Sequence, residues 1–204
     1  MNPLCVIICA GDFDPSDLPQ KRPFDLFIAA DGGAKRLEEA GVSPDVFIGD
    51  LDSLPSPPEC PETVTLPVRK DDTDSAAALK HAIAKGYSNI LLLGALGGKR
   101  LSHTLANIQL LSYARAHGAN AVIRGAGTEL KILLAGESAD IPQGCRYFSL
   151  FSLGESAAVN LRGALFPGEG LVLRRDFPLG VSNEPLSSPR AEVTRGEVLL
   201  VTEE

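Results

Sequence analysis

Residues 4–125 alternate short apolar runs with stretches of helical pattern, and this alternation limits the possible folds more than any other feature of the chain. The run NILLLGAL at 89–96 is almost uniformly Leu and Ile, which is typical of a parallel strand covered on both faces. The stretch TDSAAALKHAIAKG at 73–86 has capping residues at its start and a glycine at its end, as helices do. Strands that alternate with helices predict a three-layer α/β/α domain with a mostly parallel sheet.

The pattern changes from about Thr128, where short apolar runs follow one another between Gly, Pro and Ser turns without a long helical stretch. Such a pattern predicts a small antiparallel β-sandwich. We therefore expect an α/β domain at residues 1–127 and a β-sandwich domain at 128–204. The expected strands of the first domain are 4–10, 24–30, 45–49, 62–68, 89–96 and 120–125, and its expected helices are 32–41, 73–86 and 103–118.

The charge balance excludes some classes of partner. The chain of 204 residues has a formal net charge of −7, whereas a general nucleic-acid binder or a protein of anionic membrane surfaces needs a basic face. The four cysteines form no C-x-x-C pair and no zinc-binding spacing, and the N-terminal apolar run is too short for a signal or a membrane span. These features predict a cytoplasmic location, and they leave a small phosphorylated ligand possible, since a metal ion can supply the positive charge.

Aspartates are concentrated at the ends of the predicted strands. Of the 13 Asp residues, 11 lie at or before Asp74. Asp31 follows one predicted strand, Asp50 and Asp52 follow the next, and Asp71 and Asp74 lie between a strand and the start of a helix. Because the carboxyl ends of parallel strands meet at one edge of the sheet, where ligands bind, we expect these carboxylates to converge.

A cluster of this kind is tolerated when a divalent cation lies in it or when some of its members stay protonated. Two carboxylates about 4 Å apart repel each other by about 4 kcal/mol at an effective dielectric constant of 20. Oxygen ligands without a nearby His or Cys indicate Mg²⁺ rather than zinc. Since Mg²⁺ keeps positions open for phosphate oxygens, the basic residues Lys70, Lys99 and Arg100 and a helix N-terminus at 73–74 would face a phosphorylated ligand.

Each feature also has a purely structural interpretation. Thr73 or Asp74 can simply cap a helix, and Asp31 before two glycines can form a strand-to-helix turn. Residues 94–98 can form a tight turn, and His103 can be a surface residue at the start of a helix. Their coincidence at matching strand ends favours a ligand site. The chain has no P-loop, no G-x-G-x-x-G after the first strand and no G-x-S-x-G elbow.

Five segments carry a resemblance to a known family. AADGGAKRL, PDVFIGDLDSL, VRKDDTD, GALGGKRLSHTLANIQLL and LGVSNEP occur in the order found in the thiamine pyrophosphokinase family, and the resemblance covers nearly the whole chain. It implies transfer of the pyrophosphoryl group of ATP to the hydroxyl of thiamine, with Mg²⁺, giving thiamine diphosphate and AMP. It also implies an α/β domain followed by a β-sandwich, and a homodimer with active sites at the subunit interface.

The resemblance also implies roles for the matching residues. The residues implied to hold Mg²⁺ are Asp50, Asp52 and Asp74. Those implied to bind ATP or its phosphates are Asp31, Gly32, Gly33, Lys70, Thr73, Lys99, Arg100 and His103. Asp71 or Asp74 would accept the hydroxyl proton, and Arg100 would stabilise the charge of the transferred group. Ser182 and Asn183 would hold thiamine, from the partner subunit.

One position departs from the family pattern, and two other functions remain open. The family shows R-x-D-H after its glycines, whereas this chain has Ser102 in place of the carboxylate, with one additional residue between Gly94 and His103. The departure allows a non-catalytic protein that binds thiamine phosphates. The strand-end D-x-D of VFIGDLDSL also resembles phosphatases of the haloacid dehalogenase type, with Asp50 as the nucleophile, although the K-D-x-T-D cluster has no place there.

Overall fold

The computed structural model describes residues 2–51, 56–69 and 71–204. The chain divides into two compact units, Met1–Ala126 and Gly127–Glu204. This boundary lies one residue before the expected one, and the separate functions of the two parts stay predictions.

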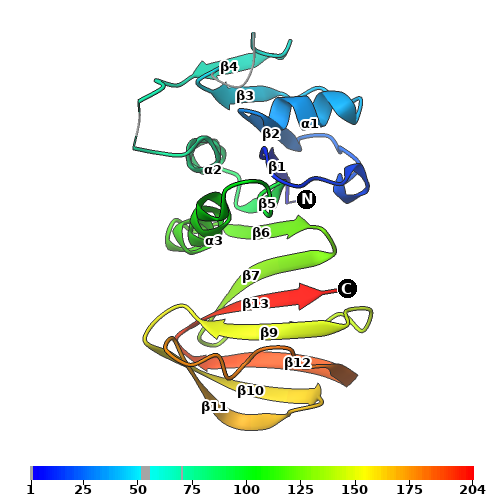
Figure 1. Ribbon diagram of the computed structural model, residues 1–204, viewed down its shortest axis with the longest axis vertical. Helices are drawn as coiled ribbons and strands as arrows, with labels where there is room; N and C mark the ends of the chain where they lie inside the picture. Colours follow the sequence, from blue (N-terminus) through cyan, green and yellow to red (C-terminus); the bar gives the residue numbers. More distant parts are fainter. Residues whose placement is uncertain (1, 52–55, 70) are drawn as a thin grey trace. The chain divides into compact units, whose positions relative to one another are not determined.

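The first unit is a parallel sheet with helices on both faces (Figure 1), which confirms the predicted three-layer arrangement. Its strands are β1 (Cys5–Ile8), β2 (Leu26–Ala30), β3 (Val46–Gly49), β4 (Glu62–Thr65), β5 (Asn89–Leu93) and β6 (Asn120–Gly125), in the order β4-β3-β2-β1-β5-β6. Each neighbouring pair is parallel. A short 3₁₀ helix, η1 (Pro15–Asp17), follows β1. Helix α1 (Gly33–Glu39) covers one face, and α2 (Asp74–Ala84) and α3 (Leu101–Ala116) cover the other.

The central strands are buried on both faces, as their uniform apolar composition predicts. All four residues of β1 are fully buried, and so are Leu92 and Leu93 at the end of β5. On the α1 side, Phe27, Leu37 and Phe47 form part of one apolar cluster. Because burying one such side chain contributes about 1.5–3 kcal/mol, the sheet is a rigid support for the loops at its edges.

The second unit is a sandwich of two antiparallel sheets, as predicted. One sheet has the order β7-β13-β9 and the other β11-β10-β12-β8. The bounds are β7 (Thr128–Leu134), β8 (Ser138–Asp140), β9 (Tyr147–Ser152), β10 (Ser156–Ala164), β11 (Gly168–Arg174), β12 (Pro185–Arg195) and β13 (Glu197–Glu203). Alternate residues of these strands, such as Phe148, Val159, Val193 and Leu200, form the core between the sheets.

No helix in the described part of the chain is long and apolar enough to cross a membrane.

Candidate active site

The order of the parallel strands reverses at β1, because β2 pairs with one side of β1 and β5 with the other. In open parallel sheets, ligands bind beyond the carboxyl ends of the strands at such a reversal. The segments that follow β1 and β5, residues 9–12 and 94–98, therefore mark the candidate site.

These two segments pack backbone against backbone. The N–H of Gly11 donates to the carbonyl of Gly94 at 2.7 Å, and the N–H of Asp12 donates to the carbonyl of Leu96 at 2.9 Å. A Cβ on Gly11 would lie 2.5 Å from both carbonyl oxygens, and a Cβ on Gly94 would lie 2.4 Å from the carbonyl oxygen of Cys9. Glycine is therefore required at both positions for the two loops to approach this closely, and the loop 94–98 is a tight backbone turn at the sheet edge.

Asp31 lies at the same edge, directly after β2. Its backbone N–H donates to the carbonyl of Ile48 in β3 at 2.8 Å, and a Cβ on Gly49 would lie 3.1 Å from its Cα. Asp31 has φ +45°, in the left-handed region that costs a non-glycine residue about 1–2 kcal/mol. Its Oδ1 atom is buried and has no hydrogen-bond partner among the described residues.

A buried carboxylate oxygen in this state is unfavourable unless a ligand supplies a positive charge or a donor. A hard oxygen donor of this kind fits Mg²⁺, which prefers carboxylate oxygens. The chemistry of Asp31 is therefore compatible with the predicted magnesium and phosphate site.

The N-terminus of α2 brings a second carboxylate to this edge. Thr73 is the N-cap residue, and its Oγ1 accepts a hydrogen bond from the N–H of Ala76 at 3.1 Å. Asp74 follows in the first turn and is half-buried. Burial, with the nearby Asp74 carboxylate as the second cause, raises the pKa of the Cys9 thiol to about 12. Ser75, which follows Asp74, is hydrogen-bonded through Asn107 to the carbonyl of Ala95, so the start of α2 lies near the loop 94–98.

The remaining sequence-predicted residues of the first unit are placed as follows. Asp50 directly follows β3 and is half-buried, whereas Asp71, Lys99, Arg100 and His103 are exposed. Asp52 and Lys70 lie outside the described residues. Within 2–51, 56–69 and 71–204, no group of three or more His, Cys, Asp or Glu residues is arranged to hold a metal ion. Since one of the three predicted metal ligands is Asp52, the ligand set stays a prediction.

The two predicted thiamine residues lie in the second unit, between β11 and β12. Ser182 is exposed, has φ +56° and donates its N–H to Ser149 Oγ at 3.0 Å. Asn183 is buried. Its Oδ1 accepts a hydrogen bond from the N–H of Phe166 at 3.1 Å, and its Nδ2 donates one to the carbonyl of Phe166 at 3.0 Å. Asn183 therefore holds the segment that carries Phe166 in place.

This segment borders an apolar cavity of about 370 Å³ inside the second unit. Phe148, Leu150, Phe166 and Leu179 are among the side chains that line it, and Asn183 lies at its wall. A cavity with apolar walls and a few polar groups beside it is typical of a site for a small organic molecule.

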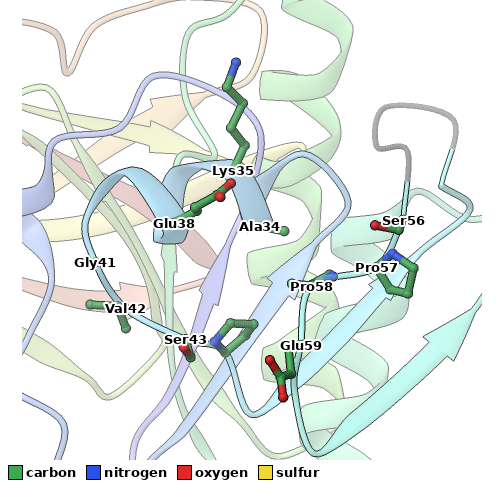
Figure 2. A pocket seen from close by; sticks show the side chains of 11 residues that line it. Ala34, Lys35, Glu38, Gly41, Val42, Ser43, Ser56, Pro57, Pro58 and Glu59 are labelled. Carbon is green, nitrogen blue, oxygen red and sulfur yellow. The ribbon is translucent and has the colours of Figure 1, made fainter.

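A different hollow of about 470 Å³ lies in the first unit, between α1 and residues 56–59. Figure 2 shows Pro57 and Pro58 across from Ala34, with the Lys35 side chain directed away from them. None of the described residues that line this hollow is a sequence-predicted site residue. The strand reversal, and not this larger hollow, therefore identifies the candidate site.

Sequence reasoning missed two buried polar residues at the site, Ser75 and Asn107. Ser75 Oγ donates to Asn107 Oδ1 at 2.8 Å, and Asn107 Nδ2 donates to the carbonyl of Ala95 at 2.8 Å. Asn107 shares the buried face of α3 with Leu111 and Ala114. A polar residue at an apolar position of a helical period is a signal that could have found it.

Comparison with known proteins agrees with the fold and identifies a family. A family model described as thiamin pyrophosphokinase, catalytic domain, matches residues 21–123. The thiamine pyrophosphokinase of Bacillus subtilis (strain 168) is 29% identical over 182 residues, which cover 80% of this chain and 79% of that protein.

Solved structures give the same result. Thiamin pyrophosphokinase from Geobacillus thermodenitrificans is similar with a TM-score of 0.81 and 26% identity, covering 98% of this chain and 97% of that chain. Thiamine pyrophosphokinase from Bacillus subtilis has a TM-score of 0.84 at 23% identity, covering 98% of both chains. The yeast thiamin pyrophosphokinase has a TM-score of 0.74 at 15% identity, covering 99% of this chain and 86% of that one. At identities of 23% and 15%, the similarity shows the fold alone.

Proposed function

Because the chain belongs to the thiamin pyrophosphokinase family, we propose that it transfers the pyrophosphoryl group of ATP to the hydroxyl of thiamine, giving thiamine diphosphate and AMP. The observation that supports this proposal is the link from the start of α2 to the loop at the strand reversal: Ser75, next to Asp74, is hydrogen-bonded through Asn107 to the carbonyl of Ala95 in the loop 94–98. The same edge includes the end of β3, which continues into Asp50.

The reaction requires an alcohol to attack the β-phosphorus of ATP. A bond forms between the thiamine oxygen and the β-phosphorus, the bond from that phosphorus to the α,β-bridging oxygen breaks, and AMP leaves with that oxygen. The protein contributes little covalent chemistry to this reaction. Positioning of the two substrates and neutralisation of the phosphate charge therefore supply most of the rate enhancement. Asp50, Asp52 and Asp74 would hold Mg²⁺, which would supply positive charge to the phosphate oxygens.

The chain's own residues complete the electrostatics. Lys99 and Arg100 lie at the start of α3 and are exposed, so they are free to reach phosphate oxygens. The N-terminus of α2 carries the partial positive charge of a helix dipole, and the side chain of Thr73 is already used as its cap. The hydroxyl proton goes to Asp71 or Asp74. A carboxylate that is bound to a metal ion is a weaker base than the same carboxylate without the metal.

Thiamine binding is assigned to the second unit. The apolar cavity beside Phe166 and Asn183 offers walls for an aromatic ring, and Ser182 lies next to it with an exposed side chain. The left-handed backbone of Ser182 is the kind of strain that clusters at ligand sites. The net charge of −7 favours the approach of the cationic thiazolium ring.

Exposed apolar side chains support a homodimer with active sites at the subunit interface. Within the described part of the chain, most large apolar side chains that are exposed belong to the second unit: Phe151, Leu165, Phe166, Val172, Phe177, Leu179, Val181 and Leu186. Apolar surface of this kind is typical of protein interfaces. Light scattering should give a mass of twice the 21.5 kDa of one chain, and a monomer at micromolar concentration would contradict the dimer.

The decisive experiment incubates the protein with ATP, Mg²⁺ and thiamine and separates the products by chromatography. Thiamine diphosphate and AMP should appear in equal amounts. Thiamine binding without AMP formation would replace the proposed function by a binding protein, and release of inorganic phosphate alone would replace it by a phosphatase.

A pair of variants tests the role of the acidic edge. Asp50→Asn should lower turnover about 100-fold, because it removes a charge that holds the metal and phosphates. Asp72→Asn is the matched control. Asp72 is exposed and its carboxylate pairs with Lys80 at 2.6 Å, and such surface ion pairs contribute little. Equal activity of the two variants would refute the assignment of Asp50.

A further inference from the structure

Buried polar side chains are rare in the first unit. Among its described residues, Asp25, Ser75 and Asn107 are the polar side chains that are buried. Asp25 binds the N–H of Leu4 and the side chain of Arg22, at the amino ends of the strands. Ser75 and Asn107, 9% and 5% exposed, lie instead beside the candidate active site.

The hydrogen bonds of this pair have one consistent set of directions. The single proton of the Ser75 hydroxyl is donated to Asn107 Oδ1, at 2.8 Å. In the 3.0 Å contact between Thr73 Oγ1 and Ser75 Oγ, Thr73 must therefore be the donor. The amide of Asn107 then donates to the carbonyl of Ala95 at 2.8 Å. The result is a continuous chain of bonds from Thr73 to Ala95.

This chain connects two separate parts of the site. Thr73 and Ser75 flank Asp74 in sequence, and Ala95 lies in the tight loop 94–98 that packs on the end of β1. Thr104, also on α3, adds a bond from its hydroxyl to the carbonyl of Gly97 at 3.3 Å. The position of Asp74 relative to the loop is thus set through α3 by side-chain hydrogen bonds.

We propose that Ser75 and Asn107 are positioning residues for pyrophosphoryl transfer, which hold the Asp74 carboxylate in register with the loop 94–98. This inference rests on the proposed function. Neither residue needs to touch the substrate, because both are buried and their hydrogen bonds are made within the protein.

Stability alone does not account for the pair. Replacing both partners of the Ser75–Asn107 bond by apolar groups leaves neither side chain unsatisfied, and the main remaining cost is the lost donor to the buried carbonyl of Ala95, about 1–3 kcal/mol. Such a replacement would, however, remove the directional link between α2 and the loop. Activity and stability should therefore separate in a suitable double variant.

The central variant is Ser75→Ala/Asn107→Leu, compared with Ser75→Thr, which keeps the hydroxyl. Tyr87→Phe is the matched control. It removes the bond from the Tyr87 hydroxyl to the carbonyl of Phe24, beyond the other end of α2. Steady-state kinetics with ATP, Mg²⁺ and thiamine are combined with thermal melting.

The double variant should lose about 100-fold in kcat, since a displacement of about 1 Å between reacting groups has an effect of this size. Its melting midpoint should fall by no more than about 12 °C, and its KM for thiamine should stay within about threefold of the wild-type value. Ser75→Thr should keep most of the wild-type kcat. A double variant with wild-type kcat, or one no more impaired than Tyr87→Phe, would overturn the inference.

Hydrogen exchange separates this inference from the proposed function. If the wild-type protein forms no thiamine diphosphate, the proposed function fails. The hydrogen-exchange rates of the amides at 74–76 and 95–98 then show whether Ser75 and Asn107 link α2 to the loop. Exchange at least about tenfold faster in the double variant, but not in Tyr87→Phe, supports the positional link. Unchanged rates in both variants overturn it.

Discussion

Replacing Gly33 by alanine should damage both the fold of the first unit and its activity. The sequence suggests a phosphate-binding role for Gly33, whereas the structure shows that α1 begins here in contact with β1. An added Cβ would lie 1.9 Å from the carbonyl oxygen of Ile8 and 2.6 Å from its carbonyl carbon. Real Cβ contacts essentially never fall below 3.0 Å, so the helix start and the strand must separate by about 1.1 Å.

The free energy follows from two opposing effects. Overpacking in a close-packed core costs about 1–3 kcal/mol, and the upper value of about 3 kcal/mol applies because the obstructing atoms belong to the backbone of a central strand. Alanine in a helix is favoured over glycine by about 1 kcal/mol. The net loss is about 2 kcal/mol, which lowers the melting midpoint by roughly 4–8 °C.

Activity should respond more strongly, because Asp31 lies two residues before Gly33 and moves with the helix start. A shift of about 1 Å predicts a loss of about 100-fold in kcat. The measurements are thermal melting and the formation of AMP. Gly144→Ala is the control, because a Cβ there meets nothing within 4 Å. Wild-type melting and wild-type kcat in Gly33→Ala would refute the reasoning.

Three further predictions concern single side chains. Asp31→Asn should lower kcat about 100-fold without lowering the melting midpoint, because it removes charge from a carboxylate whose buried oxygen has no partner among the described residues; undiminished kcat contradicts this. Burial alone would raise the pKa of Asp25, but hydrogen bonds from Arg22 and Leu4 hold it below its ordinary value of 3.8. Asp25→Asn should therefore be less stable than the wild type by about 2 kcal/mol at pH 7, and this difference in unfolding free energy should shrink as the pH falls below about 4. Urea unfolding at pH 7 and at a pH below about 4 measures the difference, and an equal difference at the two pH values excludes this explanation. Phe166→Ser should raise the KM for thiamine about tenfold, through the loss of about 1.5 kcal/mol of apolar contact, and leave melting unchanged because the side chain is 66% exposed; an unchanged KM removes the cavity from the binding site.

The fold of the first unit could be predicted because its strands are local patterns. Each expected strand contains the observed one. For the central strands β1, β2, β3 and β5, a run of buried apolar residues specifies a parallel strand without reference to its neighbours. The strand β8 (Ser138–Asp140) was missed because its three residues contain no apolar run. It forms through antiparallel pairing with residues 190–192 of β12, which depends on the tertiary structure.

The position of the candidate site stays a prediction, and the function of each of its side chains could not be predicted from the sequence. Parallel topology places Asp31 and Asp74 at one edge, and that conclusion needs only the order of strands and helices. The capping role of Thr73, the contact of Gly33 with β1 and the bonds of Asn183 to Phe166 each depend on segments distant in sequence or on local backbone geometry. A motif identifies such residues without showing which of them contact the ligand and which support those that do.

Backbone strain gives an independent reason to place ligands at these segments. In the described part of the chain, six non-glycine residues have positive φ, and Asp31, Leu51 and Ser182 are three of them. Leu51 directly follows Asp50, so each of the three lies in or beside a segment that the family resemblance associates with ligand binding. Such conformations cost about 1–3 kcal/mol each and persist only where the surrounding structure imposes them. A site that holds Asp31 strained, with a buried oxygen that no described residue satisfies, is less stable than an ordinary turn. A cationic ligand that satisfies this oxygen would recover part of that stability on binding, which is how preorganised charge favours the bound state.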